Sequence, residues 1–169
     1  LGESPLWDHR SQRLYWVDSI APEILSSDAE GGDVRRWTLE QPVGSIGLAS
    51  DGLIVALADG FYRFDPESGK VEAIAHPVMA SATRLNDGKA DRHGRFLAAS
   101  MRTGYDDDAG ALFRLDADGG WAQIESGIAI GNAVSFSPDG ETLYCADSLD
   151  GHLRRYRYDP ENGAIGPRE

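Results

Sequence analysis

The chain has 169 residues and a formal net charge of −12, because 28 aspartates and glutamates outnumber 16 lysines and arginines. This acidity argues against a nucleic acid or an anionic membrane as a partner, since phosphate binding requires a basic patch. Cys145 is the single cysteine, which excludes an internal disulfide and favours a reducing compartment, so we expect a cytoplasmic protein. No stretch approaches the roughly 18 consecutive apolar residues of a membrane span.

Short strands separated by tight turns are predicted along the whole chain. The first unit combines a turn over 7–13 with a strand over 14–18. In each of the next three units, a glycine-containing turn precedes a strand, and a second strand ends in an Asp-containing turn. These strand pairs are predicted over 53–58 and 60–65, 96–100 and 111–116, and 142–146 and 153–159. No long window has the helical period, so the chain is predicted to be all-β.

The units repeat. The turn glycines Gly52, Gly94 and Gly140 recur at intervals of about 42 to 46 residues, and a unit of this length with four strands is typical of a β-propeller blade. About four blades use the whole of residues 1–169, which we interpret as a single β-propeller domain. Rings usually have about 4–8 blades. The chain also opens on Leu1 rather than Met. We therefore expect either a small ring or part of a larger one.

Familiar catalytic motifs are missing from the sequence. It contains no G-x-S-x-G, H-E-x-x-H, C-x-x-C, P-loop or G-x-G-x-x-G pattern. The histidines lie at turns without metal-ligand spacing, and Cys145 is expected to be a small buried apolar residue. Asp106, Asp107 and Asp108 resemble half of a calcium loop, but they lack its glycine and terminal glutamate, so a solvated loop is the favoured interpretation.

Polar residues occur where the innermost strand of each blade should begin. They are Glu3, Ser45, Asn86 and Asn132, and each precedes the aspartate of its blade's turn by five to seven residues. Equivalent positions in successive blades converge on the propeller axis, so these side chains are predicted to face one another. A carboxylate and two amides form an oxygen donor set suited to Ca²⁺, Mg²⁺ or Mn²⁺ and usable by Zn²⁺. The alternative is that Asn86 and Asn132 only cap turns.

Three segments together resemble the regucalcin/gluconolactonase family, also called the senescence marker protein family. They are Leu1-Gly2-Glu3-Ser4-Pro5-Leu6-Trp7, Arg84-Leu85-Asn86-Asp87-Gly88-Lys89, and Ile130-Gly131-Asn132 followed by Ser137-Pro138-Asp139-Gly140. The resemblance runs from Leu1 to Glu169. It implies a six-bladed propeller with one divalent metal ion on its axis and hydrolysis of a sugar lactone.

The same resemblance implies roles for individual residues. Glu3 and Asn132 are expected to be metal ligands, and Arg84 and Asn86 are expected to bind substrate. The family's third protein ligand, an Asp of a Pro-Asp-Gly motif and the expected general base, would lie beyond Glu169. Asp139 is not its counterpart, since it lies in a turn between two strands. The domain is accordingly expected to be incomplete at its C-terminal end, and no catalytic base is assigned within the chain.

Two functions from different classes remain open at this point. The first is metal-dependent hydrolysis of a sugar lactone, in which Arg84 and Asn86 orient the sugar hydroxyls. The second is a non-catalytic propeller that binds a protein or a carbohydrate, because propellers host many functions. A shared register of Glu3, Asn86 and Asn132 favours the first, since a scaffold has no need of it. The lactone, the metal and the oligomeric state stay open.

Overall fold

The computed structural model describes residues 1–104 and 109–169, and these residues form fifteen β-strands and no α-helix. The first sheet contains β1 (Gly2–Asp8), β2 (Arg13–Asp18), β3 (Glu23–Ser27) and β4 (Arg35–Thr38), and the second contains β5 (Val43–Leu48), β6 (Leu53–Leu57), β7 (Gly60–Phe64) and β8 (Val71–Ala75). The third contains β9 (Thr83–Ala90), β10 (Phe96–Arg102), β11 (Gly110–Leu115) and β12 (Trp121–Ile128), and the fourth contains β13 (Gly131–Phe136), β14 (Thr142–Asp147) and β15 (His152–Arg157).

Each sheet is an antiparallel meander in which strands follow one another in sequence order. The segment after β15 returns beside it, since the amide of Glu169 donates to the carbonyl of Arg155 at 2.9 Å. The predicted all-β propeller arrangement with about four blades is confirmed. The acidic run at Asp106–Asp108 lies outside the described residues. The residues that the structure describes contain no helix that could cross a membrane.

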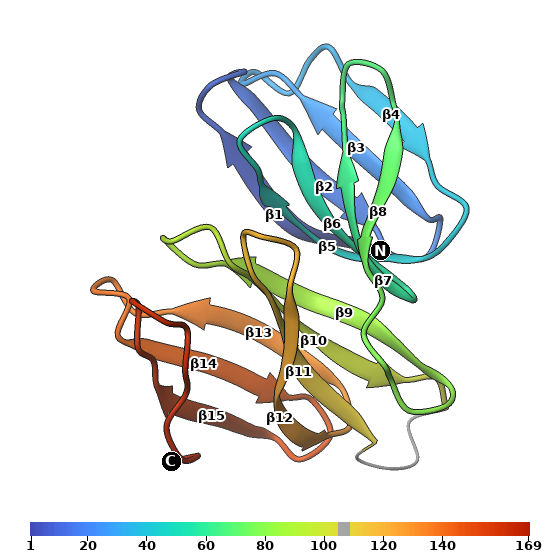
Figure 1. The fold of residues 1–169 in the computed structure, drawn as a ribbon. Coiled ribbons are helices and arrows are strands. Elements are labelled where there is room, and N and C mark those ends of the chain that lie inside the picture. Colours follow the sequence, from blue (N-terminus) through green and yellow to red (C-terminus); the bar gives the residue numbers. More distant parts are fainter. Residues whose placement is uncertain (105–108) are drawn as a thin grey trace.

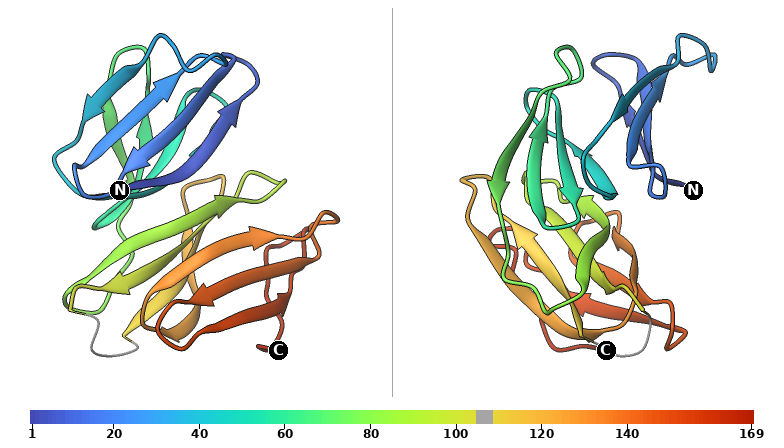
Figure 2. Two further views of the ribbon diagram at one scale, coloured as in Figure 1. Left: turned by 180° about the vertical axis from the view of Figure 1, so that it is seen from behind. Right: turned by 90° about the vertical axis from the view of Figure 1, so that its right-hand side faces the viewer.

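The four sheets follow one another round an arc (Figure 1). In the right-hand view of Figure 2, the first and fourth sheets lie on the same side of the molecule and the arc between them is open. The innermost strands β1, β5, β9 and β13 are neighbours in that order. They all run in the same direction, so that their starts lie on one face of the arc and the turns that follow them lie on the opposite face (Figure 1).

Apolar cores between successive sheets fix this arrangement. Val17 and Ile24 of the first sheet pack with Phe64 of the second, and all three are fully buried. Between the second and third sheets, the rings of Phe61 and Phe96 meet edge to face at 6.2 Å. A third core lies between the third and fourth sheets. Burying one face of each sheet against the next is the main source of stability in such a fold.

A β-bulge interrupts every innermost strand at the same level. One extra residue is inserted between Glu3 and Leu6, between Val43 and Ser45, between Leu85 and Gly88, and between Asn132 and Ser135. Bulges of this kind bend a strand and redirect its side chains. The polar residues predicted for the axis lie at or beside these bulges.

Candidate metal and substrate site

Glu3 and Asn132 occupy matching positions at the two ends of the arc. Each is the last paired residue before the bulge of its strand, opposite Val17 and Ala146 respectively. The residues that follow them, Ser4 and Ala133, have φ values of 51° and 53°. Such a left-handed conformation is uncommon outside glycine. Two bulges with the same backbone shape therefore place a carboxylate and an amide at one level of the fold.

The predicted direction toward the axis is wrong for Ser45, which is fully buried, and Asn86 lies one residue further along its strand than the position that pairs like Glu3. Val43 of β5 and Leu85 of β9 are, like Glu3, the last paired residues before the bulge of their strands, and both are fully buried. Counting back from the turn aspartates fails because these aspartates are not equivalent: Asp8 ends β1, whereas Asp91 follows the end of β9.

Asn86 nevertheless contacts Asn132 directly. Its Nδ2 atom donates to Oδ1 of Asn132 at 3.2 Å and to the carbonyl of Gly131 at 2.9 Å. The predicted pairing of these two amides near the axis is thus present in the structure, and it connects β9 to β13. The interpretation that each merely caps a turn does not account for this contact.

Side chains at the bulges also form hydrogen bonds between each innermost strand and the next. The amide of Ile46 donates to Oγ of Ser4 at 3.0 Å, the hydroxyl of Ser45 donates to the carbonyl of Asn86 at 2.8 Å, and the amide of Val134 donates to Oδ2 of Asp87 at 2.9 Å. Fully buried Ser45 therefore fixes the backbone of Asn86 rather than facing the axis. Sequence reasoning missed this role, since a serine in an apolar strand carries no signal of its partner.

Asp87 lies beside the candidate ligands and supports them. Burial raises the pKa of its carboxyl, while hydrogen bonds from the backbone amides of Val134, Gly88 and Ala133 act in the opposite direction. The carboxylate thereby anchors the bulge of β13 immediately after Asn132. The motif Arg84–Lys89 drew attention to this segment, but nothing in it indicated that Asp87 reaches the next sheet.

Arg84 precedes Asn86 by two residues on β9 and pairs with Met101, whereas Asn86 lies within the bulge of the strand. The guanidinium of Arg84 donates to the carbonyl of Leu85 at 3.0 Å. Arg84 and Asn86 are both half-buried, as a surface that receives a small polar ligand requires.

The donor set is compatible with a hard divalent cation. Glu3 is half-buried, and its carboxylate has no hydrogen-bond or ion-pair partner within residues 1–104 and 109–169. Asn132 keeps one lone pair on Oδ1, because a carbonyl-type oxygen accepts two hydrogen bonds and Asn86 supplies one. Among the described residues, however, no three His, Cys, Asp or Glu side chains form a cluster that could hold a metal ion. A cation here would therefore use amide oxygens beside the Glu3 carboxylate.

Cys145 is not part of this site. It is fully buried in β14, and burial raises the pKa of its thiol to about 12. A thiol that stays protonated at neutral pH is a poor nucleophile. The expectation of a small buried apolar residue is confirmed.

Comparison with known proteins places the chain in one family. The model of the family described as "SMP-30/Gluconolactonase/LRE-like region" matches residues 1–169, so the chain belongs to the SMP-30/gluconolactonase-like family. It is 37% identical to a 6-deoxy-6-sulfogluconolactonase of Pseudomonas putida over all of this chain and 58% of that protein. It is also 33% identical to a pentonolactonase of Haloferax volcanii over all of this chain and 57% of that protein.

Solved structures agree with the family. A calcium-binding protein, regucalcin, from Agrobacterium tumefaciens superposes with a TM-score of 0.92 at 25% identity, covering 100% of this chain and 58% of that one. A luciferin-regenerating enzyme superposes with a TM-score of 0.91 at 28% identity, covering 100% of this chain and 59% of that one. The chain thus spans less than two-thirds of the length of these relatives.

Proposed function

We propose that the protein carrying this chain hydrolyses a sugar lactone with the help of one divalent cation. The observation that carries the proposal is the contact between Asn86 and Asn132 across two sheets, at the level of the free carboxylate of Glu3. Relatives that are named as lactonases support it, since they match this chain over its whole length. The match of a regucalcin described as calcium-binding supports a cation at the axis.

In this proposal Glu3 and Asn132 bind the cation through oxygen atoms. The cation held by these residues would supply Lewis-acid polarisation of the lactone carbonyl and a more acidic water molecule. The ligand count would be completed by groups other than these two, which include the aspartate expected as ligand and general base. Calcium, zinc, manganese and magnesium are all compatible with the oxygen donors.

Arg84 and Asn86 are proposed to orient the substrate. The amide of Asn86 is directed by Gly131 and Asn132, which leaves its Oδ1 atom as an acceptor for a sugar hydroxyl. The guanidinium of Arg84, two residues before Asn86 in β9, offers several donors in a rigid planar arrangement. Fixing a lactone ring by such hydrogen bonds lowers the entropic part of the barrier to its hydrolysis.

A panel of esters tests the function. The protein is incubated with aldono-1,5-lactones, aldono-1,4-lactones and an open-chain ester of similar size, and acid release is followed with a pH indicator in the presence of Ca²⁺, Mn²⁺ or Zn²⁺. The proposal predicts cation-dependent hydrolysis of the polyhydroxylated lactones and a much lower rate for the open-chain ester. Binding of a carbohydrate or protein without acid release from any lactone would instead establish a binding platform.

Replacement of the carboxylate tests the cation site. Glu3→Gln keeps the shape of the side chain but removes its charge, so we expect cation affinity to fall by at least about tenfold, since a charged oxygen ligand is lost. Isothermal titration calorimetry of Ca²⁺ binding measures this. The matched control is Glu30→Gln, an exposed residue of the turn between β3 and β4, and it should leave the affinity unchanged. Equal affinities of the wild type and Glu3→Gln would remove Glu3 from the site.

A further inference from the structure

Asn132 is one member of a chain of hydrogen bonds with a defined direction. The chain starts at the carbonyl of Gly131, which can only accept, and therefore fixes which atom of the Asn86 amide is the nitrogen. The same nitrogen donates to Asn132 at 3.2 Å, so the atom of Asn132 that faces it must be Oδ1. The other atom of the Asn132 amide, Nδ2, then donates to the hydroxyl of Ser148 at 2.8 Å.

Ser148 ends this chain of hydrogen bonds, and its own position is fixed by the backbone. Its amide donates to the carbonyl of Ile130 at 3.0 Å, next to the strand that carries Asn132. The neighbouring residue, Asp147, is buried and accepts from the amides of Ala129 at 2.7 Å and Leu149 at 3.2 Å. The turn after β14 is thereby attached to the start of β13, and the Ser148 hydroxyl is placed opposite the Asn132 amide.

We infer that Ser148 is a positioning residue that fixes the orientation of the Asn132 side chain, so that its Oδ1 atom faces the cation site. An asparagine amide is nearly symmetric in shape, and a rotation of 180° about its last torsion exchanges an acceptor for a donor. Only hydrogen bonds at both ends of the amide prevent that exchange. Asn86 satisfies the oxygen end and Ser148 satisfies the nitrogen end. An amide nitrogen turned toward a cation would repel it.

This inference rests on the proposed function, and the experiment separates the two. Ca²⁺ dissociation constants and melting temperatures without Ca²⁺ are measured for the full-length protein and for the variants Ser148→Ala, Ser148→Thr and Ser50→Ala. Ser148 is exposed, so its replacement should leave the fold intact. Ser50 is the matched control, because it is also exposed in a turn and, among the described residues, its hydroxyl donates only to Asp51, at 3.1 Å.

Ser148→Ala is expected to weaken Ca²⁺ binding by about tenfold, as is typical when an outer-shell hydrogen bond to a ligand is lost. Ser148→Thr retains the hydroxyl and should restore most of the affinity, whereas Ser50→Ala should match the wild type. All four melting temperatures without Ca²⁺ should agree. Wild-type affinity in Ser148→Ala, or a loss that Ser148→Thr shares, would overturn the positioning role and leave the proposed function intact. A wild-type protein that binds no Ca²⁺, Mn²⁺ or Zn²⁺ would overturn both.

Discussion

At the scale of single residues, the direction of hydrogen bonds decides what the candidate site can bind. Two amides, Asn86 and Asn132, leave oxygen atoms available because their nitrogens are engaged by Gly131 and Ser148. The sequence predicted that Asn86 and Asn132 face each other, and the contact between their amides confirms this, while the roles of Glu3, Asn86 and Asn132 in binding stay predictions. The roles of Ser45, Asp87 and Ser148 could not be predicted. Each forms a hydrogen bond with a residue of another strand, and nothing in the sequence indicates which residue that is.

Cys145 provides a test of burial at this scale. Because burial raises the pKa of its thiol to about 12, the folded protein should react with a thiol reagent at pH 8 far more slowly than the protein unfolded in guanidinium chloride. Absorbance of the released chromophore measures both rates. Rapid labelling of the native protein would show that β14 is open to solvent.

Asp8 and Arg10 predict a specific response to pH. Burial alone would raise the pKa of Asp8, but hydrogen bonds from the Arg10 side chain and backbone and from Ser11 outweigh it and lower the pKa to about 2. The depressed value means that the ionised carboxylate contributes stability above pH 4, roughly its unfolded pKa, and that this contribution is lost as the pH falls toward 2.

Arg10→Gln should therefore lower the free energy of unfolding at pH 7 by about 1–2 kcal/mol. The gap in unfolding free energy between the variant and the wild type should shrink as the pH approaches 2. Arg10 also donates to the carbonyl of Ala49 in the next sheet at 2.6 Å, so its loss weakens the contact between two blades. Urea unfolding at pH 7, 4 and 2.5 measures the effect. A difference that stays constant over this range would exclude the Asp8 contribution.

At the scale of elements, the bulges of the innermost strands determine where the polar side chains lie. The repeat of turns and short strands predicted the strands well: the predicted strand over 53–58 corresponds to β6 (Leu53–Leu57), and that over 142–146 to β14 (Thr142–Asp147). The bulges were not predictable, because an inserted residue is recognisable only from its pairing partner. Counting from turn aspartates therefore wrongly predicted that Ser45 faces the axis, and it missed that Asn86 lies inside a bulge.

Close approach of β5 and β9 makes a glycine necessary at one of these bulges. A Cβ atom at Gly44 would lie 2.4 Å from the carbonyl oxygen and 2.7 Å from the Cα of Asn86, so either strand must shift. Gly44→Ala should lower the free energy of unfolding by about 1–3 kcal/mol, as overpacking usually does. It should also weaken cation binding through displacement of Asn86.

Gly94→Ala is the matched control, because it also adds a methyl group to a glycine but without a close contact. A Cβ atom at Gly94 would meet nothing within 4 Å, although the φ of +83° at this position strains an alanine. This variant should lose stability without losing cation affinity. Thermal melting and calorimetry of Ca²⁺ binding separate the two effects. Unchanged stability and unchanged affinity in Gly44→Ala would contradict the close packing of β5 on β9.

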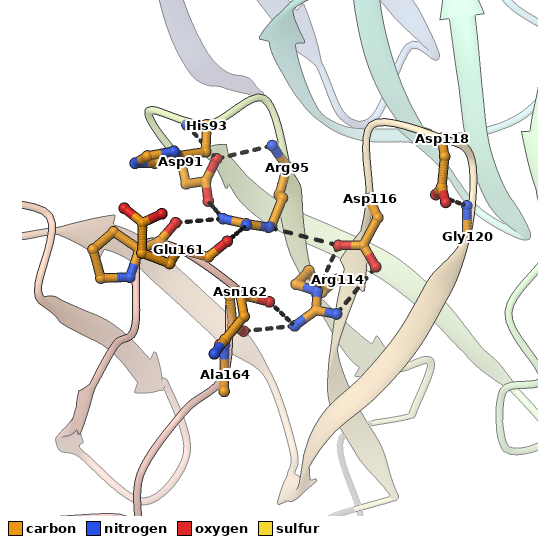
Figure 3. Close-up of polar contacts among 12 residues, drawn as sticks. Asp91, His93, Arg95, Arg114, Asp116, Asp118, Gly120, Glu161, Asn162 and Ala164 are labelled. Atoms are coloured by element: carbon orange, nitrogen blue, oxygen red, sulfur yellow. Dashed lines mark hydrogen bonds and ion pairs between the residues drawn. The ribbon is translucent and has the colours of Figure 1, made fainter.

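At the scale of the whole molecule, arginines connect neighbouring sheets by hydrogen bonds on the face of the arc opposite the candidate site. Figure 3 shows Arg95 of the third sheet reaching the turn after β15, where it donates to the carbonyls of Pro160 at 2.9 Å and Glu161 at 2.5 Å. Arg114 donates to the carbonyl of Gly163 in the same turn at 2.7 Å. The arc therefore does not depend on its apolar cores alone.

Arg95→Met should destabilise the fourth sheet. Arg95 is mostly buried and also pairs with Asp91 at 2.9 Å, so its loss leaves a buried carboxylate and two carbonyls without a charged donor. We expect the free energy of unfolding to fall by about 2–4 kcal/mol. Arg63→Met is the control, since within the described part of the chain Arg63 pairs only with the exposed Asp51, in a turn of its own sheet, and such surface pairs contribute about 0–1 kcal/mol. Equal losses in the two variants would contradict a fastening role for Arg95.

The central claim is that a cation bound among Glu3 and Asn132 enables the hydrolysis of a sugar lactone. The most direct test is the initial rate of acid release from an aldono-1,5-lactone by the full-length protein, measured before chelation with EDTA, after chelation, and after Ca²⁺, Mn²⁺ or Zn²⁺ is restored. The account predicts that chelation reduces the rate to the uncatalysed level, that at least one cation restores it, and that Glu3→Gln is not restored at the same cation concentration. A rate that survives complete removal of the cation, or that Glu3→Gln recovers in full, would contradict it.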